Sequence, residues 1–283
     1  MKIPKRIKPL VDEGLVDEVV RQLMSGKEAD VYVVRCGQDI RCAKAYKEAN
    51  KRSFRQNVQY TEGRKVKNSR RARAMEKGSR YGRQEQEQAW QNAEVDALHR
   101  LAAAGVRVPR PYNFLEGVLL MELVTDADGN AAPRLNDLAL SESQARAYHH
   151  ALVMQVVRML CAGIIHGDLS EYNVLVASDG PVIIDLPQAV DAAGNNGARA
   201  MLERDVDTLT AYFGRYAPDL RSTDYGREIW SIYASGKLHP EVELTGCFAR
   251  SEKLADVVGL IREIDDVKKE EAARQRYMQA LKQ

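Results

Sequence analysis

Apolar positions in the first half of the chain follow two different spacings. Over residues 9–24 they recur three or four positions apart, which predicts a short helix. Residues 31–43 instead carry two short apolar runs separated by a turn at Gly37, an arrangement typical of a β-hairpin. Two more strands are expected within 106–124, after a helix over about 84–104. The pattern therefore predicts a small, β-rich N-terminal half.

Helical spacing dominates the second half. A long amphipathic helix is expected to begin at Ser141, because Ser141 and Gln144 have the spacing of a capping box. A short apolar strand should then end at Asp185, and helical patterns fill most of 198–283. Together the two halves predict an α+β protein with a β-rich lobe, a connector and an α-rich lobe.

Composition narrows the class of protein. Of the 283 residues, 45% are hydrophobic and 29% are charged, as in ordinary globular proteins. No apolar run approaches the roughly 18 residues of a membrane span, and the N-terminus has no apolar signal core. The four cysteines form no C-x-x-C pair, which indicates free thiols and not a zinc site or a disulfide framework. We therefore expect a cytoplasmic protein that does not contact membranes.

Positive charge is concentrated in one segment. Residues 47–83 hold 13 lysines and arginines against 3 glutamates, a local net charge of +10, whereas the whole chain has a net charge of +2. The segment has little apolar periodicity and is expected to be mobile or partly helical. Three interpretations remain open: a solvated loop, an RNA-binding segment in which Phe54 or Tyr60 stacks on bases, or a set of autophosphorylation sites. Its candidate acceptors are Ser53, Thr61, Ser69 and Ser79.

Polar residues interrupt an apolar frame in HGDLSEYNVLV, residues 166–176. A turn is the simplest explanation for Asp168 and Asn173, because Asp, Ser and Asn favour turns. A buried carboxylate without a partner is costly, however, and further motifs flank this one in a fixed order. SGKEADVY opens the first hairpin, Lys44 lies in the next apolar strand, Glu94 lies in the following helix, and Asp185 ends an apolar strand.

This order matches the functional parts of a protein kinase. A phosphate-covering loop comes first, followed by a lysine that contacts phosphates, a glutamate that holds the lysine, a proton-accepting aspartate and the metal ligands. Magnesium prefers oxygen ligands, which Asn173 and Asp185 offer. Any one of these features is weak evidence, whereas five in the same order are strong evidence.

SGKEADVY, HGDLSEYNVLV and IIDLPQAVD resemble the RIO family of atypical protein kinases, and specifically its type-1-like branch. The N-terminal VDEGLVDEVVRQLM and the basic insertion extend the resemblance to roughly residues 10–245. It implies a small two-lobed kinase-like fold with a shortened α-rich lobe. Only Gly26 remains of the usual glycine-rich loop, Gly167 stands where most kinases have arginine, and DLP begins at Asp185 in place of DFG.

The resemblance also implies a role for each matching residue. ATP and Mg²⁺ are the expected cofactors, with Asp168 as the proton acceptor and Asn173 and Asp185 as magnesium ligands. Asp185 would carry a phosphoaspartate if the protein acts partly as an ATPase. The residues expected to bind the nucleotide are Ser25, Gly26, Lys27, Lys44, Glu94, Met121, Glu122 and Val124. Adenine would pair with the backbone of Glu122 and Val124, and Glu85 and Glu87 are the neighbouring alternatives to Glu94.

The implied organisation has four parts: an N-terminal helical segment (1–24), a kinase N-lobe (25–124) with the basic insertion, a C-lobe (125–245) and a C-terminal helical tail (246–283). The expected substrate is a serine or threonine of another protein or of the chain itself. The family's link to small-subunit ribosome maturation adds RNA or a ribosomal particle as a partner. Brevity, and the absence of long acidic or lysine-rich tails, favour a bacterial source.

Two other functions remain open. Small-molecule kinases of the aminoglycoside phosphotransferase type have a similar HGDL…N…L loop, although the SGKEADVY stretch, the basic insertion and the short α-rich lobe count against them. The second is a non-catalytic, ATP-gated scaffold on ribosomal particles. The intact set of Lys44, Asp168, Asn173 and Asp185 counts against that scaffold.

Overall fold

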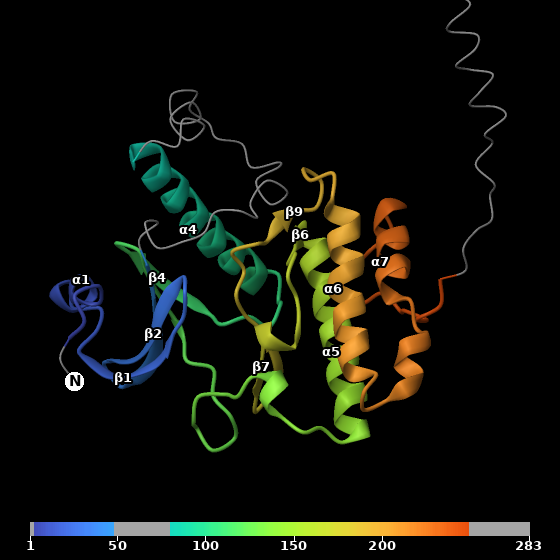
Figure 1. Ribbon diagram of the computed structural model, residues 1–283, viewed down its shortest axis with the longest axis horizontal. Coiled ribbons are helices and arrows are strands. Elements are labelled where there is room, and N and C mark those ends of the chain that lie inside the picture. The colour runs from blue at the N-terminus through green and yellow to red at the C-terminus, as the bar shows by residue number, and fades with distance from the viewer. Residues whose placement is uncertain (1–2, 48–79, 249–283) are drawn as a thin grey trace, which may run out of the picture. The chain divides into compact units, whose positions relative to one another are not determined.

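The computed structural model describes residues 3–47 and 80–248, and Figure 1 shows them as a β-rich part and a helical part. Residues 1–247 form one unit of the chain, and residues 248–283 form a second unit, of which only Phe248 is described. Most of the basic segment 47–83 and of the expected tail 246–283 therefore lies outside the described residues. Within the described ranges, no helix is long and apolar enough to cross a membrane.

The N-terminal helix is much shorter than the sequence predicts. Helix α1 (Lys8–Asp12) has Pro9 in its first turn, where the missing N–H of proline has no cost. Gly14 follows at φ +69°, a left-handed conformation that favours glycine and commonly ends helices. The predicted helix over 9–24 is therefore wrong beyond Asp12.

Residues 18–25 form a strand in place of the rest of that helix. Strand β1 (Glu18–Ser25) pairs antiparallel with β2 (Ala29–Cys36) and has two register irregularities. Of its side chains only Val19 is fully buried, because β1 lies at the edge of the sheet. The apolar residues of such a weakly buried strand happened to fit a helical spacing as well.

Five antiparallel strands form the sheet, in the order β1-β2-β3-β5-β4. Strand β3 (Asp39–Tyr46) completes the predicted hairpin with β2, and β4 (Pro111–Leu115) and β5 (Val118–Glu122) are the second predicted pair. Side chains alternate across β3, so Ala43 packs on the side of α1 and Lys44 faces a cavity on the other side.

Helix α4 (Arg80–Ala103) agrees with the predicted helix over about 84–104. Its C-terminal half buries Val95, Leu98 and Leu101 in the main hydrophobic core, which also contains Leu119 of β5. Glu94 is on the same buried part of the helix, at 5% exposure. A carboxylate in such a place needs a partner, and β3 supplies one.

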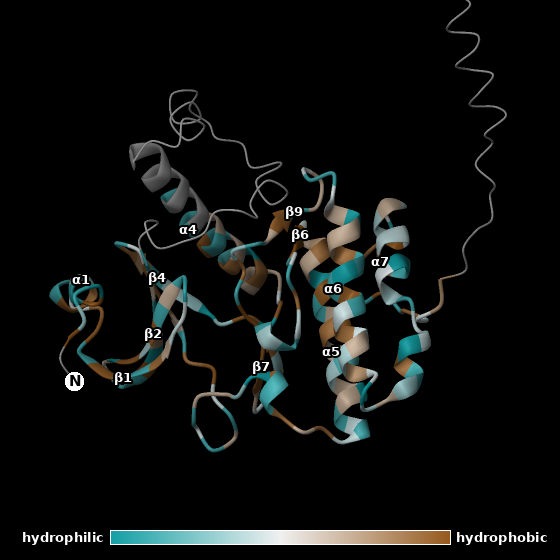
Figure 2. Ribbon diagram, in the orientation of Figure 1, coloured by the Kyte–Doolittle hydropathy of each residue, from teal (hydrophilic) through white to brown (hydrophobic). Residues whose placement is uncertain are grey.

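Three helices build most of the second lobe. Helix α5 (Glu142–Cys161) begins with the predicted capping box: Ser141 Oγ accepts from the Gln144 N–H at 3.2 Å, and the Gln144 side chain accepts from the Ser141 N–H at 3.0 Å. Helices α6 (Ala198–Phe213) and α7 (Tyr225–Ala234) contact α5 and each other (Figure 1). Figure 2 shows apolar and polar residues interspersed along α5 and α6, and the buried residues of both helices are mostly apolar, as expected of helices that cover a core.

Two short strand pairs hold the loops that carry the candidate chemistry. Strand β6 (Ile164–Ile165) pairs with β9 (Val190–Asp191), and β7 (Val174–Ala177) pairs with β8 (Gly180–Ile183). Between β6 and β7 the chain forms the 3-10 turn η3 (Glu171–Asn173). Because β6 pairs with β9, the segment after Ile165 and the segment before Val190 lie side by side. Two further 3-10 turns are η2 (Leu135–Asp137) and η4 (Pro218–Ser222).

Candidate active site

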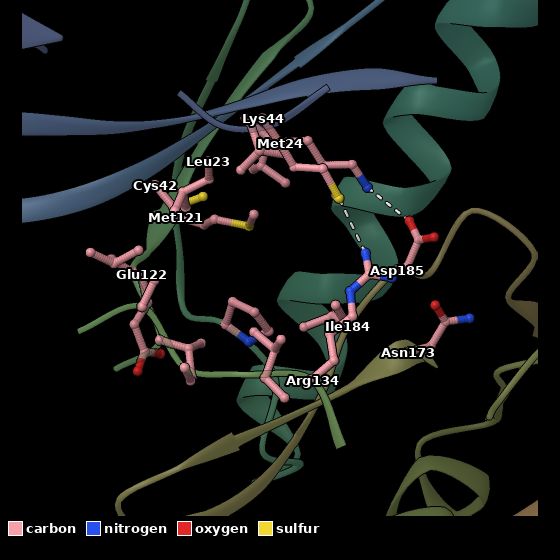
Figure 3. Close-up of a pocket in the computed structure, with 18 of the residues that line it drawn as sticks. Leu23, Met24, Cys42, Lys44, Met121, Glu122, Arg134, Asn173, Ile184 and Asp185 are labelled. Carbon is pink, nitrogen blue, oxygen red and sulfur yellow. Dashed lines mark hydrogen bonds and ion pairs between the residues drawn. The ribbon is translucent and has the colours of Figure 1, made fainter. Parts of the chain in front are cut away.

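A cavity of about 330 Å³ lies between the sheet and the helical lobe (Figure 3). This volume falls within the range of small-molecule binding sites. The apolar lining includes Leu23, Val31, Leu98, Leu119, Met121, Val124, Leu175 and Ile184. The polar lining consists of Lys44, Glu94, Glu122, Arg134, Asp137, Asn173 and Asp185. One cavity thus brings together residues that are far apart in the sequence.

Lys44 joins two carboxylates at the inner end of this cavity. Its Nζ donates to Glu94 Oε1 at 2.6 Å and to Asp185 Oδ1 at 3.0 Å. The hydroxyl of Tyr46 donates to the other oxygen of Glu94 at 2.8 Å. Glu94 is therefore held at both oxygens, and it fixes the position of the lysine. The side chains of the alternatives, Glu85 and Glu87, lie outside what the structure describes.

The ion pair between Lys44 and Asp185 favours the charged form of both groups. Burial alone disfavours a charged Lys44, but the carboxylates of Glu94 and Asp185 raise the pKa of the lysine well above its ordinary value. Burial likewise disfavours a charged Asp185, and the cation of Lys44 lowers the pKa of that carboxyl below its usual value. The cavity consequently holds a fixed cation next to an ionised carboxylate at neutral pH.

The loop between β6 and β7 presents Asp168 to solvent. Asn173 Nδ2 donates to the Asp168 backbone carbonyl at 2.9 Å, so the two residues fix each other's positions. The Asp168 N–H donates to His166 Nδ1 at 3.3 Å, and His166 Nε2 is 3.0 Å from the carbonyl of Ile184. Because Nδ1 accepts, Nε2 carries the proton and donates to Ile184. His166 thus links the Asp168 loop to Ile184 through its two ring nitrogens.

Asp185 has an unusual backbone conformation. Its φ of +65° lies in the left-handed region, which non-glycine residues seldom adopt and which carries strain. Ile184, the residue before it, is anchored on both sides, since its carbonyl accepts from His166 and its N–H donates to the Asn173 carbonyl at 3.0 Å. The surrounding contacts therefore hold the strained residue, and they turn its carboxylate toward Lys44 and the cavity (Figure 3).

The segment expected to cover phosphates is closed by its own contacts. Ser25 Oγ donates to Asp30 at 2.6 Å, and Lys47 Nζ reaches the Gly26 carbonyl at 2.7 Å and Asp30 at 2.9 Å. Lys27 is exposed. Leu23 and Met24, which directly precede Ser25 in β1, line the cavity here. Ser25, Gly26 and Lys27 are not among the residues that line it.

The connector after β5 carries a backbone donor, the Val124 N–H, that is directed to no described protein group. The Val124 carbonyl accepts from the Ala132 N–H at 2.9 Å, whereas within the described ranges the Val124 N–H has no protein acceptor. The side chain of Glu122 is held by Arg107 at 2.8 and 3.0 Å, which fixes the connector. Met121 and Val124 line the cavity beside it. The connector can therefore offer a hydrogen bond to a planar heterocycle.

Asp205 is a site residue that the sequence reasoning missed. It lies on the buried side of α6 at 2% exposure, and it accepts from the N–H groups of Gly167 at 2.7 Å and Leu169 at 3.2 Å. Arg204 donates to the Gly167 carbonyl next to it. The carboxylate therefore fixes the backbone on both sides of Asp168. The sequence feature that could have revealed Asp205 is its position on the apolar face of a predicted helix, between Leu202 and Val206.

Asp205 should give the stability of the protein a specific pH dependence. Burial raises its pKa from 3.8 to about 6, so the folded protein binds this proton more tightly than the unfolded chain does. The free energy of unfolding should therefore fall as pH rises from about 4 to about 6, through this group. Urea titrations across that pH interval measure this free energy for wild type and for Asp205→Asn. The difference, variant minus wild type, should increase as pH rises, because the variant lacks the titrating group. A stability difference that does not change with pH would contradict this assignment.

Gln188 is a second missed residue, and it contacts the expected proton acceptor. Its Nε2 donates to Asp168 Oδ2 at 3.2 Å. The pairing of β6 with β9 brings the segments that carry the two residues side by side. The Ala189 N–H donates to the Leu186 carbonyl at 3.0 Å, and this turn fixes the loop of Gln188. Sequence reasoning could not find this contact, because it depends on pairing between two-residue strands.

Replacing Gln188 by alanine should lower kcat by about 10-fold, the loss expected for one hydrogen bond to a charged group. The KM for ATP should stay nearly unchanged, because Gln188 does not line the cavity. Gln188→Glu should lower kcat further, since it places a second negative charge beside Asp168. Steady-state kinetics with Gln38→Ala, a change in the exposed β2–β3 turn, provides the matched control. A wild-type kcat in Gln188→Ala would show that Asp168 needs no such orientation.

The sheet, the cavity beneath it and the Lys44–Glu94 ion pair together define a two-lobed, protein-kinase-like α+β fold. Comparison with known proteins agrees with this class. A family model described as the RIO domain matches residues 30–225. The chain therefore belongs to the RIO family, and the predicted family and fold are confirmed.

Relatives of the chain carry kinase names. It is 35% identical over 212 residues to RIO-type serine/threonine-protein kinase Rio1 of Haloferax volcanii, a match that covers 74% of this chain and 68% of the relative. It is 27% identical over 212 residues to serine/threonine-protein kinase rio1 of Schizosaccharomyces pombe, covering 73% and 40%. It is 29% identical over 210 residues to human serine/threonine-protein kinase RIO1, a match that covers 74% of this chain and 35% of the relative. The chain thus spans less than half the length of these two eukaryotic relatives.

Proposed function

We propose that the chain is a magnesium-dependent ATP phosphotransferase that acts on serine or threonine hydroxyls of a protein or of itself. The observation that carries the proposal is the position of Lys44, held by Glu94 and Asp185 inside a cavity of nucleotide-compatible size. The kinase names of the relatives support the same reaction class.

The nucleotide would enter the cavity with its adenine at the connector. The Val124 N–H and the backbone of Glu122 would pair with the base, with Met121 at the back of the pocket. Lys44 would contact the α- and β-phosphates, because it is a point charge held in place by Glu94. Ser25, Gly26 and Lys27 would close over the phosphates from the sheet side.

Magnesium fits the oxygen donors at the Asp185 end of the cavity. Asn173 and Asp185 both line the cavity, and Figure 3 shows them at the same end. The Asn173 amide nitrogen is used by the Asp168 carbonyl, so the side-chain oxygen is the atom left for a cation. A carboxylate and an amide oxygen are ligands that Mg²⁺ prefers. When bound, the ion would neutralise charge on the phosphates.

Asp168 would accept the proton of the attacking hydroxyl. In the transfer, the hydroxyl oxygen forms a bond to the γ-phosphorus, the bond from that phosphorus to the β,γ-bridging oxygen breaks, and ADP leaves. The proton released from the hydroxyl goes to Asp168, which is solvent-exposed and held by Gln188 and Asn173. Gly167 has no side chain to hold the loop, and the Asp205 carboxylate instead binds the backbone N–H of Gly167.

The acceptor and the partners are part of the same proposal. The serines and the threonine of 47–83 are the candidate autophosphorylation sites, and the +10 charge of this segment suits RNA or a ribosomal particle. The segment is almost wholly outside the described residues. A cytoplasmic location is also part of the proposal, and the four scattered cysteines support it because they are free thiols.

Incubation with γ-labelled ATP and magnesium tests the proposal. Wild type should place acid-stable label on serine or threonine, Asp185→Ala should not, and Asp128→Ala, a change in an exposed turn, should behave as wild type. Free phosphate without stable label would indicate an ATPase. Label on added aminoglycosides, or ATP binding without any turnover, would overturn the protein kinase assignment.

A further inference from the structure

The cavity contains a second cation to which the proposed reaction gives no role. Arg134 lies at the end of the connector, and its backbone forms a bridge with Leu175 of β7, two residues after Asn173. Its guanidinium extends across the cavity, where Nη2 is 3.3 Å from Met24 Sδ of β1 (Figure 3). Arg134 therefore reaches from the lower side of the cavity to the strand that precedes the phosphate-covering segment.

The contact with Met24 occupies one N–H donor of the Arg134 guanidinium with a weak acceptor. A thioether sulfur is a weak acceptor, whereas a guanidinium has five N–H donors arranged for carboxylate or phosphate oxygens. Among the described residues, Arg134 forms no ion pair with a carboxylate, although Asp137 also lines the cavity. Lys44, the other cation of the lining, is by contrast paired with two carboxylates.

The charge of Arg134 acts on the part of the cavity where phosphates would lie. Arg134 lines the same cavity as Lys44 and Asp185. Lys44 comes from the sheet, and Arg134 comes from the opposite side next to β7. An anion that enters between them would meet cations from both lobes.

We propose that Arg134 binds the phosphates of the bound nucleotide from the side opposite Lys44. The inference rests on the proposed function, because it requires the cavity to hold a nucleotide. On binding, the guanidinium exchanges the sulfur of Met24 for phosphate oxygens, which are much stronger acceptors. Arg134 is then a nucleotide-binding residue that belongs to neither the lysine–glutamate pair nor the metal ligands.

Calorimetric binding of ATP and of adenosine, each with magnesium, tests this proposal. Arg134→Met should weaken ATP binding by about 10- to 100-fold, the range for hydrogen bonds to a charged group, and leave adenosine binding unchanged. Arg134→Lys keeps the charge without the planar fork and should show a smaller loss for ATP only. Arg110→Met removes an exposed arginine outside the cavity and should bind ATP as wild type does.

The comparison of the two ligands separates this proposal from its alternatives. Equal losses for ATP and adenosine in Arg134→Met would mean that the side chain only shapes the cavity, and an unchanged ATP affinity would mean that it contacts no phosphate; either result overturns the proposal. If Arg134→Met does not fold, the selective loss for ATP in Arg134→Lys decides. Failure of wild type to bind ATP would instead refute the proposed function.

Discussion

Asp168→Asn should lower kcat by about 10²- to 10⁴-fold, the usual contribution of a positioned proton acceptor. ATP affinity should change little, because Asp168 does not line the cavity and its contact with Asn173 is made by its backbone carbonyl. Asparagine keeps the size of the side chain but cannot accept the proton of the attacking hydroxyl. The change is therefore expected in kcat, with the dissociation constant for ATP close to wild type.

Single-turnover kinetics and equilibrium binding of ATP measure the two quantities separately. Asp128→Asn, the same chemical change in an exposed turn, is the matched control and should leave both at wild-type values. Undiminished transfer in Asp168→Asn would remove Asp168 as the proton acceptor. A loss of ATP affinity as large as the loss of rate would instead indicate that the substitution disturbs the loop that holds Asn173.

Lys44→Ala should weaken ATP binding and turnover together. Removing the cation leaves Glu94 buried, with Tyr46 as its one remaining partner among the described residues, and leaves Asp185 without its ion pair. Breaking a buried ion pair by removing one partner costs about 3–5 kcal/mol, so the free energy of unfolding should also fall. The loss of a charge-assisted contact to phosphate should weaken ATP binding by at least about 10-fold.

A second substitution tells these effects apart. Lys44→Ala combined with Glu94→Gln removes the stranded carboxylate, so it should recover part of the stability and none of the turnover. Lys237→Ala, which removes an exposed lysine, is the control for the change in net charge. Unchanged ATP affinity with full turnover in Lys44→Ala would exclude Lys44 from the site. Urea denaturation measures the free energy of unfolding, and ATP affinity and turnover are measured separately for each variant.

The sequence predicted the parts of the fold that local chemistry determines. The hairpin around Gly37, the capping box at Ser141 and the strand pair within 106–124 depend on residues that are close in sequence. Strand β1 was missed because it is an edge strand that buries only Val19, and weak burial leaves helix and strand spacing hard to distinguish. Tertiary pairing with β2 decides its conformation.

The same distinction applies to the site. Asp168, Asn173 and Asp185 could be proposed because each occurs within a short motif, and Lys44 because it lies in the apolar strand that follows SGKEADVY. Glu94 could be narrowed only to one of three neighbouring glutamates, and the register of α4 against β3 brings it to Lys44.

Asp205 and Arg134 belong to no motif that we recognised, and Gln188 lies within IIDLPQAVD but was assigned no role there. Each reaches the site through long-range packing: α6 against the loop of Asp168, β6 with β9, and the bridge between Arg134 and Leu175. Such contacts depend on the assembled fold and not on a local pattern of residue types.

The most direct test of the central claim is the rate at which the γ-phosphate of ATP is lost, to any acceptor, in wild type and in Asp185→Ala. At saturating ATP and magnesium, wild type should turn over ATP, and the variant should lose nearly all of this activity while still binding adenosine. Turnover by Asp185→Ala at the wild-type rate would show that the chemistry does not take place at the Lys44–Asp185 end of the cavity.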